Sequence, residues 1–293
     1  NGTNALYLAC KAIDLKKNDI VWTVPITFAA TVNAALMCDA KVDFVDIDLK
    51  TFNISIEKLQ QKLLSTSKSK LPKLLMVVHL GGNPVDMKKI FSLSKKYKFK
   101  VIEDASHAMG SSYMGEKIGS CKWSDICVFS FHAVKSITTS EGGAILTNKF
   151  SYYKNMRLIR ENGLVSSLKS SGMINYNLLK PGLNFRISEV LAALGLSQMT
   201  KLNRFILKRN LIAKYYKSKI HNYPLKIQHV QKNCKSSYHL FVILLNETFK
   251  INNRDKIISL LKKKNYYLNS HYKALHLSDY FKNLGFKRGN FPN

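Results

Sequence analysis

The feature that most constrains the fold is an alternation of short apolar strands with amphipathic helices over residues 1–150. Strands are expected at Asp19–Val24, Val42–Asp46, Leu74–His79, Lys100–Glu103, Ile126–Phe131 and Gly143–Thr147. Helices are expected at Ala5–Ile13, Phe28–Cys38, Ile54–Leu64 (with Asn53 or Ser55 as N-cap) and Val85–Tyr97. Such alternation predicts an α/β protein, in which helices cover both faces of a mainly parallel sheet.

The pattern changes after residue 150. Helices are expected at Phe150–Asn162, Ile187–Ile220 and Asn253–Lys264, strands at Tyr238–Leu245 and Tyr266–Asn269, and an irregular loop at Ser166–Gly182. We therefore predict a large domain over residues 1–200 and a smaller α+β domain over residues 201–293. The chain starts directly in a helical pattern and ends abruptly at Phe291-Pro292-Asn293, so we expect a fragment that is truncated at both ends.

The charge balance suggests a second class of function. The chain carries 46 Lys and Arg against 18 Asp and Glu, a net charge of +28, which is typical of a nucleic-acid or anionic-membrane binder. However, 26 of the basic side chains and only 5 acidic ones lie in residues 151–293, and only seven of the 46 are Arg, the better reader of phosphates and bases. No binding motif accompanies the charge, and no apolar run approaches the ~20 residues that span a bilayer. We expect neither nucleic acid nor a membrane as partner.

The cysteines favour a reducing compartment. The five cysteines are scattered, form no CxxC pair and have no histidine at metal-ligand spacing. No signal peptide opens the chain. We predict buried thiols, no metal site and a cytoplasmic location.

Chemically capable side chains follow several of the expected strands. Asp104 ends one strand and His107 lies three residues further on, while Ser130 ends the next strand and Lys135 follows it. In an open parallel sheet, ligands bind at the carboxyl ends of the strands. Each residue alone has an ordinary explanation, because a lysine in a turn is mostly a solvated surface residue and an aspartate after a strand mostly a turn former.

Together with two N-terminal features, these residues match the needs of pyridoxal phosphate. A lysine amine such as that of Lys135 forms a Schiff base with the cofactor aldehyde, and a buried carboxylate such as Asp104 keeps the pyridine nitrogen protonated. The flat ring of Phe28 can stack on the cofactor ring. The amides of Gly2 and Thr3 at a helix N-terminus, with a hydroxyl such as that of Ser130, can hold the phosphate.

Several collinear motifs then carry a resemblance to a known family. They are Asn1-Gly2-Thr3, Thr23–Phe28, Glu103–Gly110, Ser130–Thr139, Glu141–Ala144, Gly182–Glu189 and Ala192–Gln198. In these motifs the chain resembles the sugar-nucleotide aminotransferases of the DegT/StrS family. The resemblance implies a fold-type I pyridoxal-phosphate aminotransferase with an α/β/α sandwich, and a homodimer with shared active sites.

The resemblance also implies roles for individual residues. Lys135 would be the catalytic Schiff-base lysine, Asp104 would pair the pyridine nitrogen and Phe28 would stack on the ring. His107 would lie near the phenolic oxygen, where the family often has glutamine. Gly2, Thr3 and Ser130 would bind the phosphate, and Asn184 would reach the phosphate of the neighbouring subunit.

Within the family the chain looks most like the UDP-4-amino-4,6-dideoxy-N-acetyl-β-L-altrosamine transaminases of pseudaminic acid synthesis. The strings Ser130–Thr139, Ser236–Leu240 and Ser270–His276 support that branch. It implies transfer of an amino group from L-glutamate to a UDP-linked 4-keto-6-deoxy-N-acetylhexosamine. The alternatives are the same chemistry on a different nucleotide keto-sugar and the basic nucleic-acid binder.

Overall fold

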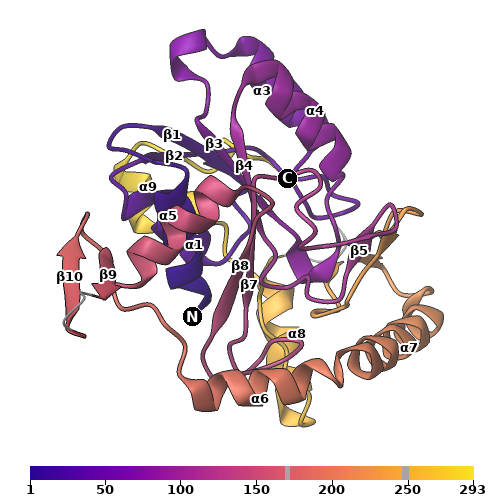
Figure 1. The fold of residues 1–293 in the computed structure, drawn as a ribbon. Helices are drawn as coiled ribbons and strands as arrows, with labels where there is room; N and C mark the ends of the chain where they lie inside the picture. Colours follow the sequence, from indigo (N-terminus) through magenta and orange to yellow (C-terminus); the bar gives the residue numbers. More distant parts are fainter. Residues whose placement is uncertain (169–171, 246–250) are drawn as a thin grey trace.

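A six-stranded sheet forms the centre of the computed structural model, which describes residues 1–168, 172–245 and 251–293 (Figure 1). Its strands are β1 (Ile20–Thr23), β2 (Lys41–Phe44), β3 (Leu74–Val78), β4 (Lys100–Asp104), β7 (Ile126–Ser130) and β8 (Gly143–Leu146), in the spatial order β2-β1-β3-β4-β7-β8. All neighbours pair in parallel except β7 and β8, which pair antiparallel. The predicted mainly parallel sheet is confirmed.

Helices cover both faces of this sheet. Figure 1 shows α1 (Gly2–Ala12) and α5 (Phe150–Arg160) on one side, and α3 (Ile56–Ser65) and α4 (Met87–Tyr97) on the other. The helix α2 (Ala29–Leu36) packs against α1. Successive strand residues point to opposite faces, and both faces are apolar and buried. Met76 and Ile102 belong to the core under α1 and α2, whereas Leu75 and Val101 belong to the core under α3 and α4. The α/β/α sandwich is therefore confirmed.

Side-chain caps fix where several of these helices begin. The Asn1 side chain accepts from the amide of Asn4 at 2.9 Å, and the Ser55 hydroxyl accepts from the amide of Lys58 at 3.2 Å. Each cap satisfies one of the amides that the first helical turn leaves without a partner. Ser55 is thus the cap of α3, and Asn53, the other candidate, instead donates to the carbonyl of Asn83 at 2.9 Å.

The antiparallel strand β8 begins at the carboxyl edge of the sheet, where β7 ends. Ser130, the last residue of β7, pairs with Gly143, the first residue of β8. The loop 131–142 between them therefore starts and ends at the same edge. The amide of Phe131 donates to the carbonyl of Gly142 at 2.9 Å, which closes the base of this loop.

Short elements decorate the central layers. The strands β5 (Ser112–Tyr113), β6 (Glu116–Lys117) and β12 (Cys234–Lys235) form a small antiparallel sheet, and β11 (Leu225–Ile227) pairs with β13 (Ile243–Leu245). Short 3₁₀ turns lie at Lys68–Lys70, Leu80–Gly82 and Leu275–Leu277. The remaining helices are α6 (Glu189–Met199), α7 (Leu202–Ile220), α8 (Ile251–Lys263) and α9 (Asp279–Asn283).

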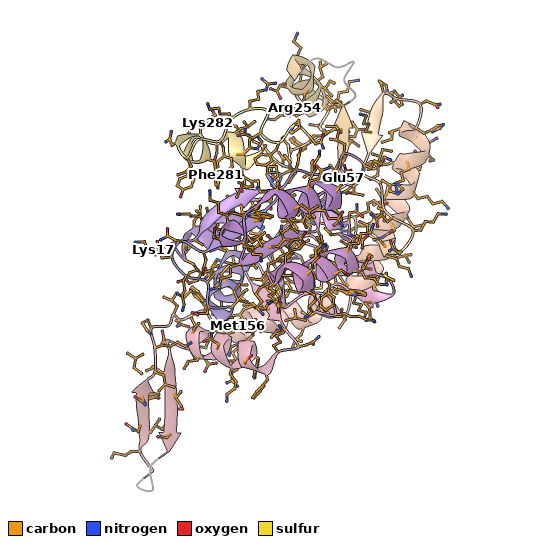
Figure 2. All side chains as sticks on the ribbon, turned by 90° about the horizontal axis from the view of Figure 1, so that it is seen from above. Lys17, Glu57, Met156, Arg254, Phe281 and Lys282 are labelled. Carbon is orange, nitrogen blue, oxygen red and sulfur yellow. The ribbon has the colours of Figure 1, made fainter. Side chains whose placement is uncertain are left out.

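The prediction of an irregular loop at Ser166–Gly182 is wrong. The chain there forms the antiparallel hairpin of β9 (Leu164–Leu168) and β10 (Ile174–Leu178), which projects from the body of the molecule in Figure 2. Apolar and polar residues alternate along β10, which is a strand pattern. The serine- and glycine-rich stretch between the strands concealed that signal, and residues 169–171 of the predicted loop lie outside the described residues.

Three other expectations after residue 186 need correction. The single helix Ile187–Ile220 is two helices, because the chain turns at Thr200 and Lys201, where the Lys201 amide donates to the carbonyl of Gln198. The strand expected at Tyr238–Leu245 comprises only Ile243–Leu245. The carbonyls of Tyr238 and His239 instead accept from Arg209 Nη1, both at 3.1 Å. No strand forms at 266–269.

Two further observations bear on the predictions. The five cysteines are free and buried, as predicted. Among the described residues, no helix is both long and apolar enough to cross a membrane. The division into domains 1–200 and 201–293 stays a prediction, and its boundary falls at the turn between α6 and α7.

Candidate active site

Asp104 is a buried carboxylate at the carboxyl end of β4. Its Oδ2 accepts a 2.7 Å hydrogen bond from the hydroxyl of Thr31 on α2, and its Oδ1 accepts from the amide of Ser106 at 3.2 Å. Thr31 is itself 2.8 Å from the hydroxyl of Thr27. Because the carboxylate can only accept, Thr31 donates to it and Thr27 donates to Thr31. This chain of hydroxyls holds the Asp104 carboxylate in place on the face of the sheet that α2 covers.

Lys135 lies in the loop 131–142, close to Asp104. Burial disfavours the charged ammonium and lowers the pKa of Lys135, and the negative charge of Asp104 opposes that shift. Within the described residues the Lys135 amine has no hydrogen-bond partner. A half-buried amine with a lowered pKa and no partner is suited to act as a nucleophile.

The N-terminus of α1 lies against the end of β7. A Cβ atom added to Gly2 would lie 2.9 Å from the Cβ of Ser130, so only glycine allows the backbone of α1 to approach this closely. The first amides of a helix point outward without partners and carry the positive end of the helix dipole. Gly2 therefore lies against Ser130, with Thr3 next to it in the first turn of α1, in an arrangement suited to an anion.

An aromatic wall flanks this region. Phe28 precedes α2 and is 59% exposed, and its ring centroid lies 5.9 Å from that of Tyr272. The Tyr272 hydroxyl is 3.3 Å from Nε2 of His107. The segment that carries Tyr272 is attached to the end of β1, since the amide of Leu275 donates to the carbonyl of Pro25 at 2.8 Å. Phe28 thus presents a free ring face beside a buried histidine and a tyrosine.

Two buried histidines face Lys135. Burial lowers the pKa of His107 well below its ordinary value, and Lys135, His239 and His271 lower it further. The ring centroids of His107 and His239 are 4.6 Å apart. Burial, Lys135, Arg209 and His271 lower the pKa of His239 to about 3. Both imidazoles are therefore neutral at ordinary pH.

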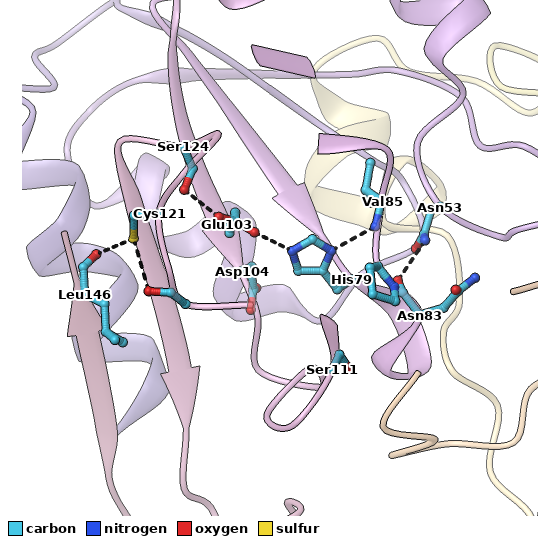
Figure 3. A network of polar contacts seen from close by, with 12 residues as sticks. Asn53, His79, Asn83, Val85, Glu103, Asp104, Ser111, Cys121, Ser124 and Leu146 are labelled. Carbon is cyan, nitrogen blue, oxygen red and sulfur yellow. Dashed lines mark hydrogen bonds and ion pairs between the residues drawn. The ribbon is translucent and has the colours of Figure 1, made fainter. Parts of the chain in front are cut away.

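A second polar network lies on the opposite face of β4 (Figure 3). Glu103 precedes Asp104 and points away from it, because neighbouring residues of a strand face opposite sides. Nε2 of His79 lies 2.8 Å from Glu103, whose other oxygen accepts from the hydroxyl of Ser124. Nδ1 of His79 accepts from the amide of Val85 at 3.1 Å. The end of β4 is thus anchored through Glu103 while Asp104 faces the site.

Asn184 does not join this cluster within one chain. It is exposed and forms an isolated bridge with Glu161, at the end of α5. No contact between Asn184 and the other predicted site residues is found in the described parts of the chain. Its role toward a neighbouring subunit stays a prediction.

The residues present fit pyridoxal phosphate. A buried carboxylate held by a hydroxyl suits the pyridine nitrogen, an unpartnered amine suits the aldehyde, and the free face of Phe28 suits the ring. The close approach of Gly2 to Ser130 leaves helix amides and a hydroxyl for the phosphate.

Sequence reasoning missed Thr31, Tyr272 and His239 as site residues. Thr31 lies one helical turn after Phe28, a spacing that places both at the start of α2, so a polar residue there was detectable. Tyr272 and His239 were noted only as parts of branch-specific strings. Their approach to His107 depends on how residues far apart in the sequence pack.

Comparisons with known proteins identify relatives along the whole chain. The model of the DegT/DnrJ/EryC1/StrS aminotransferase family matches residues 1–293. The UDP-4-amino-4,6-dideoxy-N-acetyl-beta-L-altrosamine transaminase of Campylobacter jejuni (serotype O:23/36, strain 81-176) is 40% identical over 286 residues, which are 97% of this chain and 73% of that protein.

Two solved structures share the fold. Helicobacter pylori PseC, an aminotransferase involved in the biosynthesis of pseudoaminic acid, has a TM-score of 0.88 and 30% identity, over 97% of this chain and 74% of that one. The PLP-form of the putative sugar aminotransferase Spr1654 from Streptococcus pneumoniae has a TM-score of 0.89 and 27% identity, over 99% and 76%. The chain therefore belongs to the DegT/DnrJ/EryC1/StrS aminotransferase family, and it is a pyridoxal-phosphate-dependent aminotransferase of nucleotide sugars.

Proposed function

We propose that this enzyme transfers the amino group of L-glutamate to a UDP-linked 4-keto-6-deoxy-N-acetylhexosamine, in the synthesis of pseudaminic acid or a related bacterial surface glycan. The observation that carries the proposal is the 40% identity, over 97% of the chain, to a UDP-4-amino-4,6-dideoxy-N-acetyl-beta-L-altrosamine transaminase. The likeness to a solved aminotransferase of pseudoaminic acid biosynthesis supports the same substrate class. We also propose that the reaction takes place in the cytoplasm.

Lys135 is the proposed catalytic residue. Bound pyridoxal phosphate supplies an electron-withdrawing ring that stabilises negative charge on the carbon from which a proton is removed. Lys135 would hold the cofactor covalently. Once the amine of the amino donor has displaced it, the free Lys135 amine would move the proton between the cofactor carbon and the sugar carbon. Its lowered pKa raises the fraction of neutral amine that can accept the proton.

Asp104 and Phe28 are proposed to orient the ring. The carboxylate of Asp104 would favour a proton on the pyridine nitrogen, because an opposite charge stabilises the charged form. Thr31 keeps the carboxylate oxygen at a fixed position. Phe28 stacks on one face of the ring. His107 is proposed to lie near the phenolic oxygen without donating to it, because its Nδ1 accepts from Gly81 and its Nε2 faces Tyr272.

The phosphate is proposed to bind where α1 meets β7, with Asn184 supplied by a second subunit. The amides of Gly2 and Thr3 and the hydroxyl of Ser130 offer donors from one chain. Asn184 is exposed and so is available to a partner. A homodimer with shared sites would also cover the apolar helix α6, which has no buried residue in one chain and whose Val190 is 78% exposed.

Product analysis tests the substrate. The protein is incubated with L-glutamate and a panel of nucleotide 4-keto and 3-keto sugars, and the amino sugar is identified by mass spectrometry and NMR. We expect conversion of the UDP-linked 4-keto-6-deoxy-N-acetylhexosamine. Conversion only of a sugar on another nucleotide, or of a 3-keto sugar, would contradict the proposed substrate within the same family.

Chemical trapping tests the catalytic residue. Borohydride should fix the cofactor onto the peptide that contains Lys135, with loss of the visible absorbance. Lys135→Ala should abolish the adduct, whereas Lys117→Ala, at an exposed position, should retain it. An adduct that persists in Lys135→Ala would reject the assignment.

A further inference from the structure

Tyr272 lies where the aromatic wall meets the buried histidines. Its hydroxyl is 3.3 Å from Nε2 of His107, and its ring centroid is 5.9 Å from that of Phe28. The rings of Tyr272 and His107 are stacked, with an interplanar angle of 27°. Tyr272 comes from the C-terminal part of the chain, far in sequence from the predicted cofactor contacts. Only the packing of the chain brings it beside Phe28 and His107.

The hydrogen bonds around His107 have a defined direction. The amide of Gly81 donates to Nδ1 of His107 at 3.3 Å, so Nδ1 is an acceptor. A neutral imidazole carries one N–H, which must then be on Nε2. Nε2 therefore donates to the Tyr272 oxygen, and the hydroxyl proton of Tyr272 points to a different acceptor.

That acceptor is not part of the described protein. No described residue accepts from the Tyr272 hydroxyl. Burial and the nearby negative charge of Asp104 raise the pKa of Tyr272 to about 12, so the phenol keeps its proton. A half-buried hydroxyl with a retained proton and no acceptor, next to Phe28 and Asp104, is placed to serve a ligand.

We propose that Tyr272 donates a hydrogen bond to an oxygen of the ligand bound in this site, and that His107 is the positioning residue that orients the tyrosine. This inference rests on the proposed function. The acceptor is an oxygen of pyridoxal phosphate or of the nucleotide keto-sugar, and the two differ in when they enter the site.

Tyr272→Phe tests the hydroxyl, because it keeps the ring and its stacking. Tyr238→Phe is the matched control, since that hydroxyl is 2.7 Å from Lys217 Nζ, outside the site. One arm titrates the cofactor-free protein with pyridoxal phosphate and follows absorbance. The other measures kcat and KM for the sugar that the panel shows to be converted. In Tyr272→Phe, loss of one such hydrogen bond is expected to weaken binding of either the cofactor or the sugar about tenfold. In Tyr238→Phe both affinities should stay unchanged.

Substitutions of His107 test the direction of the hydrogen bonds that run from Gly81 through His107 to Tyr272. His107→Gln keeps an acceptor for Gly81 and a donor for Tyr272, so it should retain binding, whereas His107→Leu should lose it to the same extent as Tyr272→Phe. In the double variant the two losses should not add, because both remove the same hydrogen bond.

The results separate the inference from the proposed function. Unchanged binding in both arms for Tyr272→Phe would overturn the role of Tyr272. Fully additive losses would show that His107 contacts the ligand by itself and would overturn the positioning role. If no UDP-linked sugar is converted, the proposed substrate fails, while the cofactor titration and the sugar that is converted still decide the role of Tyr272.

Discussion

Thr31 Oγ1 donates a 2.7 Å hydrogen bond to Oδ2 of Asp104, joining the first turn of α2 to the end of β4. The contact links two residues 73 positions apart in the sequence. It fixes the carboxylate before any ligand enters, so the orientation of Asp104 does not have to be acquired on binding.

Thr31→Val is expected to weaken cofactor binding with little change in fold. A hydrogen bond to a charged group contributes about 1.5–3 kcal/mol, so the dissociation constant for pyridoxal phosphate should rise about tenfold or more. Absorbance titration of the cofactor-free protein measures this. Thr66→Val is the control, because its hydroxyl bonds the carbonyl of Lys62 at the end of α3. Equal affinities in both variants would show that Thr31 does not orient Asp104.

The rate at which Lys135 reacts with pyridoxal phosphate is expected to increase with pH, and the midpoint of this increase should lie below pH 10.5. Burial lowers the pKa of this amine from 10.5 and Asp104 raises it. Removing the carboxylate charge in Asp104→Asn should therefore move the midpoint to a lower pH. Stopped-flow absorbance at a series of pH values measures the rate. A midpoint that moves upward in Asp104→Asn would contradict the proximity of the two side chains.

The protein is expected to lose stability on acidification below about pH 6.5. Burial lowers the pKa of His239 from 6.5 to about 3, so between these values the unfolded chain binds a proton that the folded chain excludes. Stability from the neutral imidazole is present above pH 6.5 and decreases as the pH falls, by up to about 1.4 kcal/mol per pH unit.

His239→Asn should reduce that acid sensitivity. Denaturant unfolding at pH 7 and pH 5 gives the free energies to be compared. His221→Asn replaces an exposed histidine and should leave the pH dependence unchanged. If the free energy of unfolding changed equally between pH 7 and pH 5 in the wild type, His239→Asn and His221→Asn, a titrating role for His239 would be excluded.

Complementation is expected between two inactive variants if Asn184 serves the neighbouring subunit. Mixing Lys135→Ala with Asn184→Ala chains yields mixed dimers in which one site has both residues, about a quarter of all sites after random exchange. Activity should appear on mixing and increase as subunits exchange. Absence of any gain in a mixture that sedimentation shows to be dimeric would place Asn184 outside the shared site.

The central sheet and most of the site were predictable because their signals are local. Apolar strands alternate with capped helices over residues 1–150, and Asp104, Ser130 and Lys135 follow strand ends, where the topology of a parallel sheet places ligands. Sequence pattern did not predict the hairpin of β9 and β10 or the turn between α6 and α7. The short polar stretches at these places are compatible with a loop as well as with a strand or a helix.

The contacts of Tyr272 and His239 could not be predicted from local pattern. Both residues reach His107 from segments more than 130 positions away, through packing that no periodicity describes. Hydrogen-bond direction was equally hidden, since it depends on the amide of Gly81 fixing the tautomer of His107.

The pairing of Ser130 with Gly143 has a consequence for how such an enzyme can diversify. The sheet closes beneath loop 131–142, so residues of the loop can be exchanged without altering the strands that support it. Lys135, the proposed catalytic lysine, is carried on this loop, whereas Asp104 belongs to the sheet itself. If Lys135 and Asp104 have the proposed roles, altered reactivity can evolve in the loop while the aspartate, and the folding of the sheet around it, stay unchanged.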